Sequence, residues 1–220
     1  MYKRQDLCEQ KPVLAQQVNV IGVENICDIF LGKIIHISTD YVFDGLKGPY
    51  KENNRTCPVS VYGKTKLEAE KIILNHNSKN LIIRANVIYG NSNNTNASFF
   101  NWVVESLNKN NKINVVNDQY NNPTWSKSIA NVICLCIKHN IKGLYHWGDK
   151  EILSRYQFAL KIAKKFDLDE KLIQPISTEN LNQIAKRPLK SGLINEKLEN
   201  ILNVEAPSVD ECLKIIKETI

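Results

Sequence analysis

The chain has 220 residues, of which 43% are hydrophobic and 24% are charged, and its formal net charge is +6. These proportions are typical of a soluble globular protein, and the basic residues are too scattered for a nucleic-acid-binding tract. No apolar run approaches the roughly 18 residues of a membrane span. The six cysteines and four histidines show no metal-ligand spacing. We therefore expect a cytoplasmic protein with no nucleic-acid partner, no membrane partner and no metal site.

The first half of the chain predicts helices and buried strands in alternation. Residues 1–5 show no periodicity and are predicted to be unstructured, whereas 12–30 have the apolar spacing of a helix. A buried strand over 33–39 follows and ends in Ser-Thr-Asp. A second helix is predicted from Ser60, as N-cap, to about Asn75.

The next predicted strand covers 80–90 and completes a strand-helix-strand unit, which implies a parallel pair with a right-handed crossover. The composition shifts near residue 92, which is the best candidate for a domain boundary. The later predicted elements are helix 98–108, strand 113–116, a turn-rich segment over 117–124, helix 126–139, strand 143–148, helix 154–166, strand 173–176, and helices near 195–202 and 208–219.

Tyr62 and Lys66 are one helical turn apart, and this pair alone is not specific, because chance supplies about one such pair in a chain rich in lysine. The helical wheel places both on the face that continues through Ala69 and Ile73, opposite a fully polar face. Lys66 is therefore predicted to point toward the packed side, where an ammonium needs a partner. The alternative is a lysine that snorkels at the rim of the helix.

Several short segments resemble the motifs of the extended short-chain dehydrogenase/reductase family, and within it the branch of the dTDP-4-dehydrorhamnose reductases. They follow one another in the order found in that family. The resemblance covers residues 6 to about 216. The segments are Asp6 to Val20, His36 to Gly45, Val61 to Lys66, Arg84 to Gly90, Asn117 to Gln119 with Pro123 and Thr124, and Arg187 with Pro188.

The resemblance implies an α/β fold with a partial Rossmann-like, doubly wound parallel sheet and a smaller C-terminal α+β substrate-binding subdomain. Residues 1–92 are then expected to be the C-terminal part of an NAD(P)-binding Rossmann domain. Residues 93–220 are expected to form mainly the subdomain, with 126–148 returning to the Rossmann sheet.

The nine glycines do not form the glycine-rich motif that binds a dinucleotide. We therefore expect an N-terminally truncated fragment that lacks the first strands and the glycine-rich loop of the family. Such a fragment is expected to leave strand 33–39 with an open edge beside apolar faces, to bind NADPH or NADH weakly, and to be inactive alone.

The resemblance also implies an activity, the NAD(P)H-dependent reduction of a nucleotide-linked 4-keto sugar in dTDP-rhamnose biosynthesis. Tyr62 would donate a proton to the substrate carbonyl oxygen, and Thr39 would polarise that carbonyl. The Lys66 ammonium would favour the Tyr62 phenolate and bind the nicotinamide ribose.

Further site residues follow from the same resemblance. The expected cofactor contacts are Ser38, Tyr62 and Lys66, and Asn19 occupies the position of the family's structural asparagine, with a helix-surface amide as the alternative. Val87 stands where the rhamnose-pathway enzymes typically carry a tryptophan, which leaves the particular sugar open. The expected substrate contacts are Thr39, Asp40, Val87, Gln119 and Arg187, with Asn122 as a further candidate; Gln119, Asn122 and Arg187 could instead be turn residues or surface charges.

Three functions remain open. The first is the reductase, the second is a non-catalytic relative that acts as a binding or regulatory subunit, and the third is a nucleotide-sugar epimerase or dehydratase of the same fold. The complete set of Thr39, Tyr62 and Lys66 favours the reductase. A dehydratase usually has an Asp-Glu pair after the threonine, whereas Asp40 and Tyr41 stand here. A homodimer and the choice between NADPH and NADH also remain open.

Overall fold

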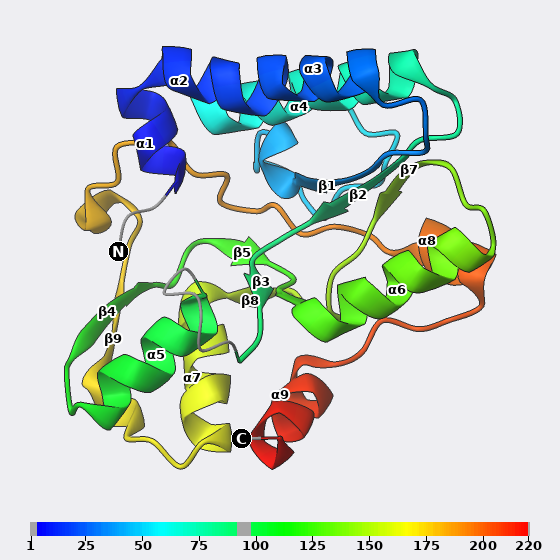
Figure 1. Cartoon of the computed structure of the whole chain (residues 1–220). Helices are drawn as coiled ribbons and strands as arrows, with labels where there is room; N and C mark the ends of the chain where they lie inside the picture. Colours follow the sequence, from blue (N-terminus) through cyan, green and yellow to red (C-terminus); the bar gives the residue numbers. More distant parts are fainter. Residues whose placement is uncertain (1–3, 92–97, 220) are drawn as a thin grey trace.

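The computed structural model describes residues 4–91 and 98–219, and within them the largest sheet has three parallel strands in the order β1-β2-β7 (Figure 1). Helix α4 (Val61–His76) connects β1 to β2, and the two strands pair in parallel over their whole length. The predicted βαβ unit is therefore confirmed. The three strands are β1 (Ile35–Thr39), β2 (Leu81–Ala85) and β7 (Gly143–His146).

Helices cover both faces of this sheet, with α4 on one side and α6 (Ser126–Lys138) on the other (Figure 1). Ile82 packs with Ile73 of α4, whereas Leu81 and Ile83 belong to the cluster that includes α6 residues. Side chains alternate between the faces of a strand, so a strand covered on both sides is apolar throughout. The continuous apolar run of β2 has this origin.

The N-terminal helices lie beside α4 (Figure 1). The prediction of an unstructured start is wrong for Arg4 and Gln5, which belong to α1; residues 1–3 lie outside the described part. Glu9 of α1 accepts a hydrogen bond from the Val61 backbone N–H at 2.7 Å, a contact that local periodicity does not reveal. The predicted helix over 12–30 is confirmed, with a π-helical turn in its middle. These elements are α1 (Arg4–Gln10), α2 (Pro12–Gln16), η1 (Gln17–Ile21) and α3 (Gly22–Ile29).

Strand β1 lies at an edge of the sheet, because within the described residues it pairs with β2 alone. The loop that leads into β1 exposes Leu31, with 87% of its surface accessible, and Ile29 of α3 is similarly exposed. The expectation of an open edge beside apolar faces is therefore confirmed. The other exposed apolar residues of α2, η1 and α3 are Val13, Leu14, Val18, Ile21 and Ile26.

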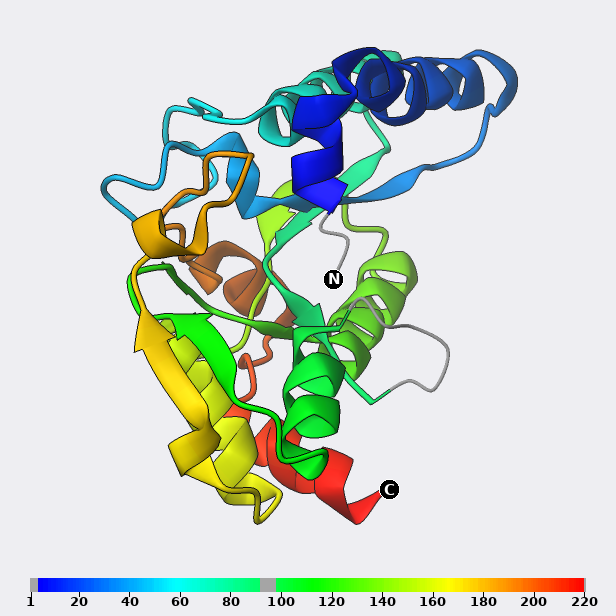
Figure 2. The ribbon, with the colours of Figure 1, turned by 90° about the vertical axis from the view of Figure 1, so that its left-hand side faces the viewer.

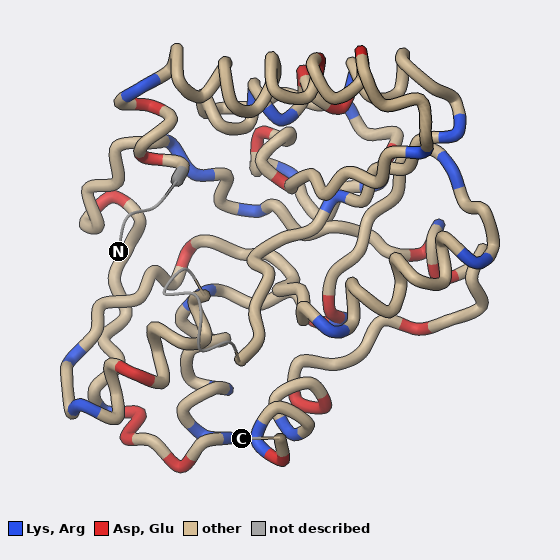
Figure 3. The backbone as a smooth tube through the Cα atoms, viewed as in Figure 1, with Lys and Arg blue, Asp and Glu red and all other residues tan. Residues whose placement is uncertain are grey.

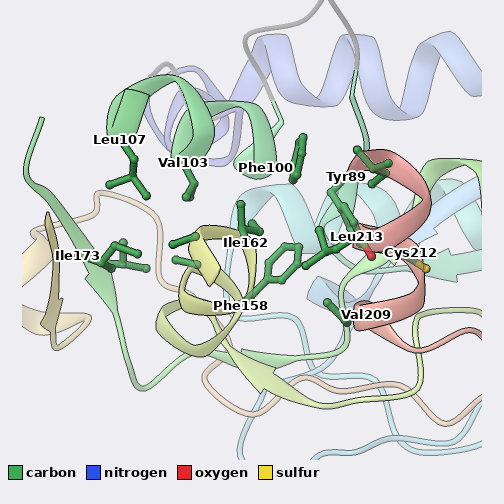
Figure 4. Packing of buried hydrophobic residues seen from close by; sticks show 14 of the residues in the cluster. Tyr89, Phe100, Val103, Leu107, Phe158, Ile162, Ile173, Val209, Cys212 and Leu213 are labelled. Atoms are coloured by element: carbon green, nitrogen blue, oxygen red, sulfur yellow. The ribbon is translucent and has the colours of Figure 1, made fainter. Parts of the chain in front are cut away.

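A second region packs around a two-stranded parallel sheet, in which β4 (Ile113–Val116) pairs with β9 (Ile173–Ile176). Its helices are α5 (Phe99–Asn108), α7 (Arg155–Lys165) and α9 (Val209–Glu218). They lie far from α2 and α3 in both ribbon views (Figures 1 and 2). Figure 4 shows their apolar core, in which Phe100, Phe158, Ile162 and Leu213 are buried.

Two short strand pairs join the regions, and here the sequence prediction needs correction. The predicted strand over 80–90 ends at Ala85, because Val87 has a φ of 33°, which an extended strand does not permit. The segment 117–124, predicted as turns only, contributes to two strands. The pairs are β3 (Ile88–Tyr89) with β6 (Thr124–Trp125), and β5 (Tyr120–Asn121) with β8 (Leu153–Ser154).

The tail crosses between the two regions before α9. Basic and acidic residues are interspersed along the described chain (Figure 3). Among the described residues no helix could span a membrane, and no group of three or more His, Cys, Asp or Glu could hold a metal. The predicted domain boundary at residue 92 lies outside the described residues, and the division into 1–92 and 93–220 stays a prediction. The remaining elements are η3 (Glu170–Leu172), η4 (Glu179–Leu181) and α8 (Glu196–Leu202).

Candidate active site

The carboxyl end of β1 carries Thr39, and the chain then turns into the short helix η2 (Asp40–Val42). The Thr39 Oγ1 atom accepts a hydrogen bond from the Tyr41 backbone N–H at 3.2 Å and donates one to Asp40 Oδ1 at 3.1 Å. Open α/β sheets bind ligands outside the carboxyl ends of their strands. The buried threonine therefore stands where the fold places a ligand.

Helix α4 begins beside η2, and two residues explain the close approach. Ser60 caps the helix, as predicted, by accepting a hydrogen bond from the Gly63 backbone N–H at 3.1 Å. A Cβ atom at Gly63 would lie 2.2 Å from the Tyr41 carbonyl oxygen, so only glycine fits here. As a result the rings of Tyr62 and Tyr41 meet edge to face, with centroids 5.6 Å apart.

Tyr62 is half-buried, and this burial raises the pKa of its phenol to about 12. The Asp40 carboxylate also raises the pKa, whereas a hydrogen bond with the Thr39 side chain lowers it. The Lys66 side chain leads to β1 in this structure, so the expectation that its ammonium favours the phenolate stays a prediction.

The Lys66 Nζ atom lies 2.7 Å from His36 Nε2 and donates a hydrogen bond to the Ile37 carbonyl oxygen at 2.8 Å. The position on the packed side is therefore confirmed, and the partners exclude a lysine that merely snorkels. Burial lowers the pKa of Lys66 to about 8, against the raising effect of Glu70. Burial, together with the Lys66 charge, lowers the pKa of His36 to about 4, so the imidazole is neutral and its Nε2 can accept.

Ser38 and Asn19 both form hydrogen bonds with side chains of helix α4. The Ser38 hydroxyl donates a short hydrogen bond to the Glu70 carboxylate, and only 5% of the residue is exposed. The hydroxyl is therefore already bonded to Glu70, and its contact with a cofactor stays a prediction. Asn19 lies in the π-helical turn and donates to Thr65 Oγ1 at 3.0 Å, which excludes the simple surface amide.

Asp40 is 2% exposed and accepts a hydrogen bond from the Ser191 hydroxyl at 2.5 Å. Burial raises the pKa of this carboxyl to about 6, against the effects of Ser191, Arg155 and Thr39. Val87, the other predicted contact near the strand ends, is half-buried just beyond β2. Asp40 therefore belongs to the same buried cluster as Thr39 and Tyr62.

Gln119 and Arg187 come together near a cavity of about 570 Å³, although they are far apart in the sequence. Arg187 lines the cavity, and Gln119 donates hydrogen bonds of 3.0 Å to Thr178 and Gln183, which also line it. With 7% of Gln119 and 5% of Arg187 exposed, neither is a surface residue.

The two terminal nitrogen atoms of the Arg187 guanidinium group differ in their partners. Its Nη2 atom donates to Asp6 Oδ1 at 2.7 Å, whereas Nη1 is buried with no hydrogen-bond partner among the described residues. Its Cζ atom lies 6.0 Å from the centroid of the Tyr41 ring, which in turn meets the Tyr62 ring. Asn122, by contrast, is occupied by the protein: its amide binds Asp149, Leu193 and Asn86.

Sequence reasoning missed Arg155, at the first turn of α7. Its guanidinium interacts electrostatically with Asp40, Tyr41 and Arg187, and burial lowers its pKa while Tyr41 and Asp40 raise it. The only local signal is the capping box from Ser154, which fixes the start of the helix. The approach to Asp40 depends on tertiary packing. Reasoning from the motifs also missed His36 and Glu70 as partners of the site.

Comparisons with known proteins identify the family of the chain. The sequence matches the family described as the RmlD substrate binding domain over residues 1–219. It is 32% identical over 231 residues to dTDP-4-dehydrorhamnose reductase of Aggregatibacter actinomycetemcomitans, covering 98% of this chain and 78% of that protein. The dTDP-4-dehydrorhamnose reductase of Bacillus anthracis, solved in complex with NADP, superposes with a TM-score of 0.92 at 28% identity, covering 100% of this chain and 78% of that chain.

The chain also resembles methionine adenosyltransferase 2 subunit beta of Xenopus laevis, with 33% identity over 209 residues and 90% of this chain covered. It spans 62% of the length of that protein. The Rossmann-like α/β fold and the resemblance found in the sequence are both confirmed. The chain belongs to the RmlD substrate-binding domain family, within the extended short-chain dehydrogenase/reductases.

Proposed function

We propose that this protein is an NAD(P)H-dependent reductase of a nucleotide-linked 4-keto sugar of the dTDP-4-dehydrorhamnose type. The observation that carries the proposal is the convergence of Thr39 and Tyr62 at the carboxyl end of β1, with Lys66 one turn further along α4. The similarity to two dTDP-4-dehydrorhamnose reductases, one of them solved with NADP, supports the same reaction and the same cofactor.

The residues at β1 fit a nicotinamide cofactor. Lys66 has three N–H donors, and His36 and the Ile37 carbonyl engage two of them, so one donor remains for a ribose hydroxyl. Tyr62 and Lys66 would hold the nicotinamide end, and the bound cofactor would supply the hydride. The present residues would orient the substrate carbonyl and supply the proton.

Tyr62 is the proposed proton donor, and its raised pKa keeps the phenol protonated at neutral pH. The Thr39 hydroxyl would donate a hydrogen bond to the carbonyl oxygen, where negative charge develops as the hydride arrives. Once the proton has moved, the phenolate would be stabilised by Thr39 and by the Lys66 ammonium if that group turns from His36 toward Tyr62. This rotation is the step that would link the observed arrangement to a reactive one.

The nucleotide end of the substrate is proposed to bind in the cavity beside Arg187. Its unpaired Nη1 atom is a buried donor, and a guanidinium matches the oxygens of a diphosphate. A bound phosphate oxygen would satisfy that donor, which is otherwise costly to bury. Arg155 would add a second positive charge near Asp40.

The test is NADPH and NADH oxidation by the complete gene product with dTDP-4-dehydrorhamnose, in the wild type and in Tyr62→Phe. We expect kcat to fall by about 10²-fold or more in Tyr62→Phe, because the proton donor is lost. Tyr120→Phe is the matched control, since it removes the hydroxyl of a residue that is 37% exposed and should keep full activity. Wild-type turnover that survives Tyr62→Phe unchanged would refute the role of Tyr62.

A second candidate is a non-catalytic subunit, as the similarity to methionine adenosyltransferase 2 subunit beta suggests. One site observation favours it: Lys66 is engaged by His36 rather than by Tyr62, whose pKa is high. This alternative predicts no turnover in the wild type and co-purification of the complete gene product with a methionine adenosyltransferase. Turnover together with no such complex would favour the reductase.

A further inference from the structure

We propose that Glu70 is a positioning residue, which holds the Lys66 ammonium and helix α4 in register with β1. The catalytic part of this inference rests on the proposed function, whereas the contacts of Glu70 do not depend on it. Glu70 is 2% exposed and lies one turn after Lys66 on α4. No motif used to recognise the site includes it.

The Glu70 carboxylate forms a buried, two-pronged ion pair with Arg84 of β2. Arg84 Nε donates to Glu70 Oε1 at 2.9 Å, and Nη2 donates to Oε2 at 2.7 Å. Ser38 of β1 donates to the same carboxylate, and Arg84 Nη1 lies 3.4 Å from His146 Nε2 of β7. Ser38, Arg84 and His146 are direct neighbours across the sheet. One carboxylate from α4 therefore engages two strands directly and a third through Arg84.

The contacts between α4 and β1 repeat with a matched spacing. His36 and Ser38 are two residues apart and share a face of the strand, and they contact Lys66 and Glu70, which are one turn apart on the helix. Two residues of strand span about 6.6 Å, and four residues of helix span about 6 Å. Sliding α4 along β1 would therefore break both contacts together.

Glu70 also acts on the charge of Lys66. The groups in contact with the ammonium are His36 and the Ile37 carbonyl from β1, whereas the Glu70 carboxylate, which is paired with Arg84, acts on it electrostatically from one turn further along α4. Of these, His36 is neutral, and Glu70 supplies the negative charge that opposes the effect of burial. Without Glu70 the half-buried lysine would lose its proton more readily, and a neutral amine would no longer stabilise a Tyr62 phenolate.

The test measures the reactivity of Lys66 by competitive acetylation and mass spectrometry across a pH series, in the wild type and in Glu70→Gln. At pH 7 we expect acetylation of Lys66 to be about two- to threefold faster in the variant, because more of the lysine is deprotonated. Glu68→Gln is the control, since it removes the same charge two residues away on the same helix, at an exposed site. Unchanged Lys66 reactivity in folded Glu70→Gln would overturn the proposal.

Glu70→Gln leaves Arg84 buried without its partner, which lowers the stability of the variant. Arg84→Gln is the second test, because it keeps the Glu70 carboxylate and removes the opposite charge beside it, so acetylation of Lys66 should be slower than in the wild type; acetylation as fast as or faster than in the wild type would overturn the proposal. Acetylation requires no turnover, so a lack of reductase activity would refute the proposed function without affecting this test. If the wild type is active, the alkaline limb of its kcat profile should move to lower pH in Glu70→Gln and stay in place in Glu68→Gln.

Discussion

The two regions of the molecule bury different kinds of side chain. Around β1, β2 and α4, the interior contains ionisable groups, among them Asp40, Glu70, Arg84 and His146, each at most 4% exposed. Around α5, α7 and α9, the core is a cluster of aromatic and aliphatic side chains (Figure 4). Apolar burial stabilises a fold directly, whereas a buried charge must be paired before it stops being costly. The polar interior therefore marks the region that performs the proposed chemistry.

The substitution with the largest expected effect on stability is Arg84→Gln, in the region with the buried ionisable groups. The variant leaves the Glu70 carboxylate buried without its ion pair, and we expect the free energy of unfolding to fall by about 3–5 kcal/mol. Urea titration followed by circular dichroism measures the change. Lys150→Gln is the control, because its ion pair with Glu205 is largely exposed and should contribute less than about 1 kcal/mol. Equal effects of the two variants would contradict the contrast.

In the second region the comparable test is Leu213→Ala, which opens a cavity in the apolar core. Leu213 is fully buried, and we expect a loss of about 2–5 kcal/mol in the free energy of unfolding. Unlike Arg84→Gln, it should leave the acetylation profile of Lys66 unchanged. A shifted Lys66 profile in a folded Leu213→Ala variant would show that the two regions are coupled.

Asp149 lies where the regions meet, and its environment predicts that the stability of the fold depends on pH. Its carboxylate accepts from the Tyr89 hydroxyl at 2.6 Å and from the Trp125 backbone N–H at 3.1 Å, and burial raises its pKa to about 7. Because the folded state binds this proton more tightly than the unfolded state, the stabilisation is complete below about pH 4 and is lost as the pH rises toward 7. The lowered pKa values of His36 and His146 act in the opposite direction.

The Asp149 contribution is isolated by comparing the wild type with Asp149→Asn. The stability advantage of the wild type over the variant should shrink between pH 4 and 7, by at most about 1.4 kcal/mol for each pH unit. Chemical denaturation at several pH values measures this difference. An advantage that grows with pH would show that the carboxyl is ionised in the folded state throughout this range.

The smallest expected effect comes from the cap of α7. The Ser154 hydroxyl accepts from the Gln157 backbone N–H at 3.0 Å within a capping box. Ser154→Ala should lower the free energy of unfolding by about 1 kcal/mol, measured by urea titration. Ser154→Asp, which keeps a capping acceptor, should retain most of the stability. A fall in kcat measured where the variant is fully folded would indicate that the cap also positions Arg155.

Local patterns sufficed for much of the fold. Apolar spacing and capping residues lie within a few positions of each other, so they predicted β1, α4 with its Ser60 cap, the parallel crossover and most later helices. They failed where distant contacts decide the backbone. Helix α1 is held near its C-terminal end by the Val61 backbone N–H, which donates to Glu9, and the break after β2 depends on the unusual conformation of Val87.

The candidate site divides in the same way. The sequence alone placed Thr39, Tyr62 and Lys66 in two segments that resemble the family, and it predicted that Lys66 points toward the packed side. Only the tertiary structure decided that Lys66 contacts His36 and that Glu70 joins α4 to the sheet. His36 lies on β1 and Glu70 binds residues of β1 and β2, whereas Arg155 acts on Asp40 electrostatically from a helix far along the chain. No local spacing encodes such contacts, because they arise only when separate elements pack together.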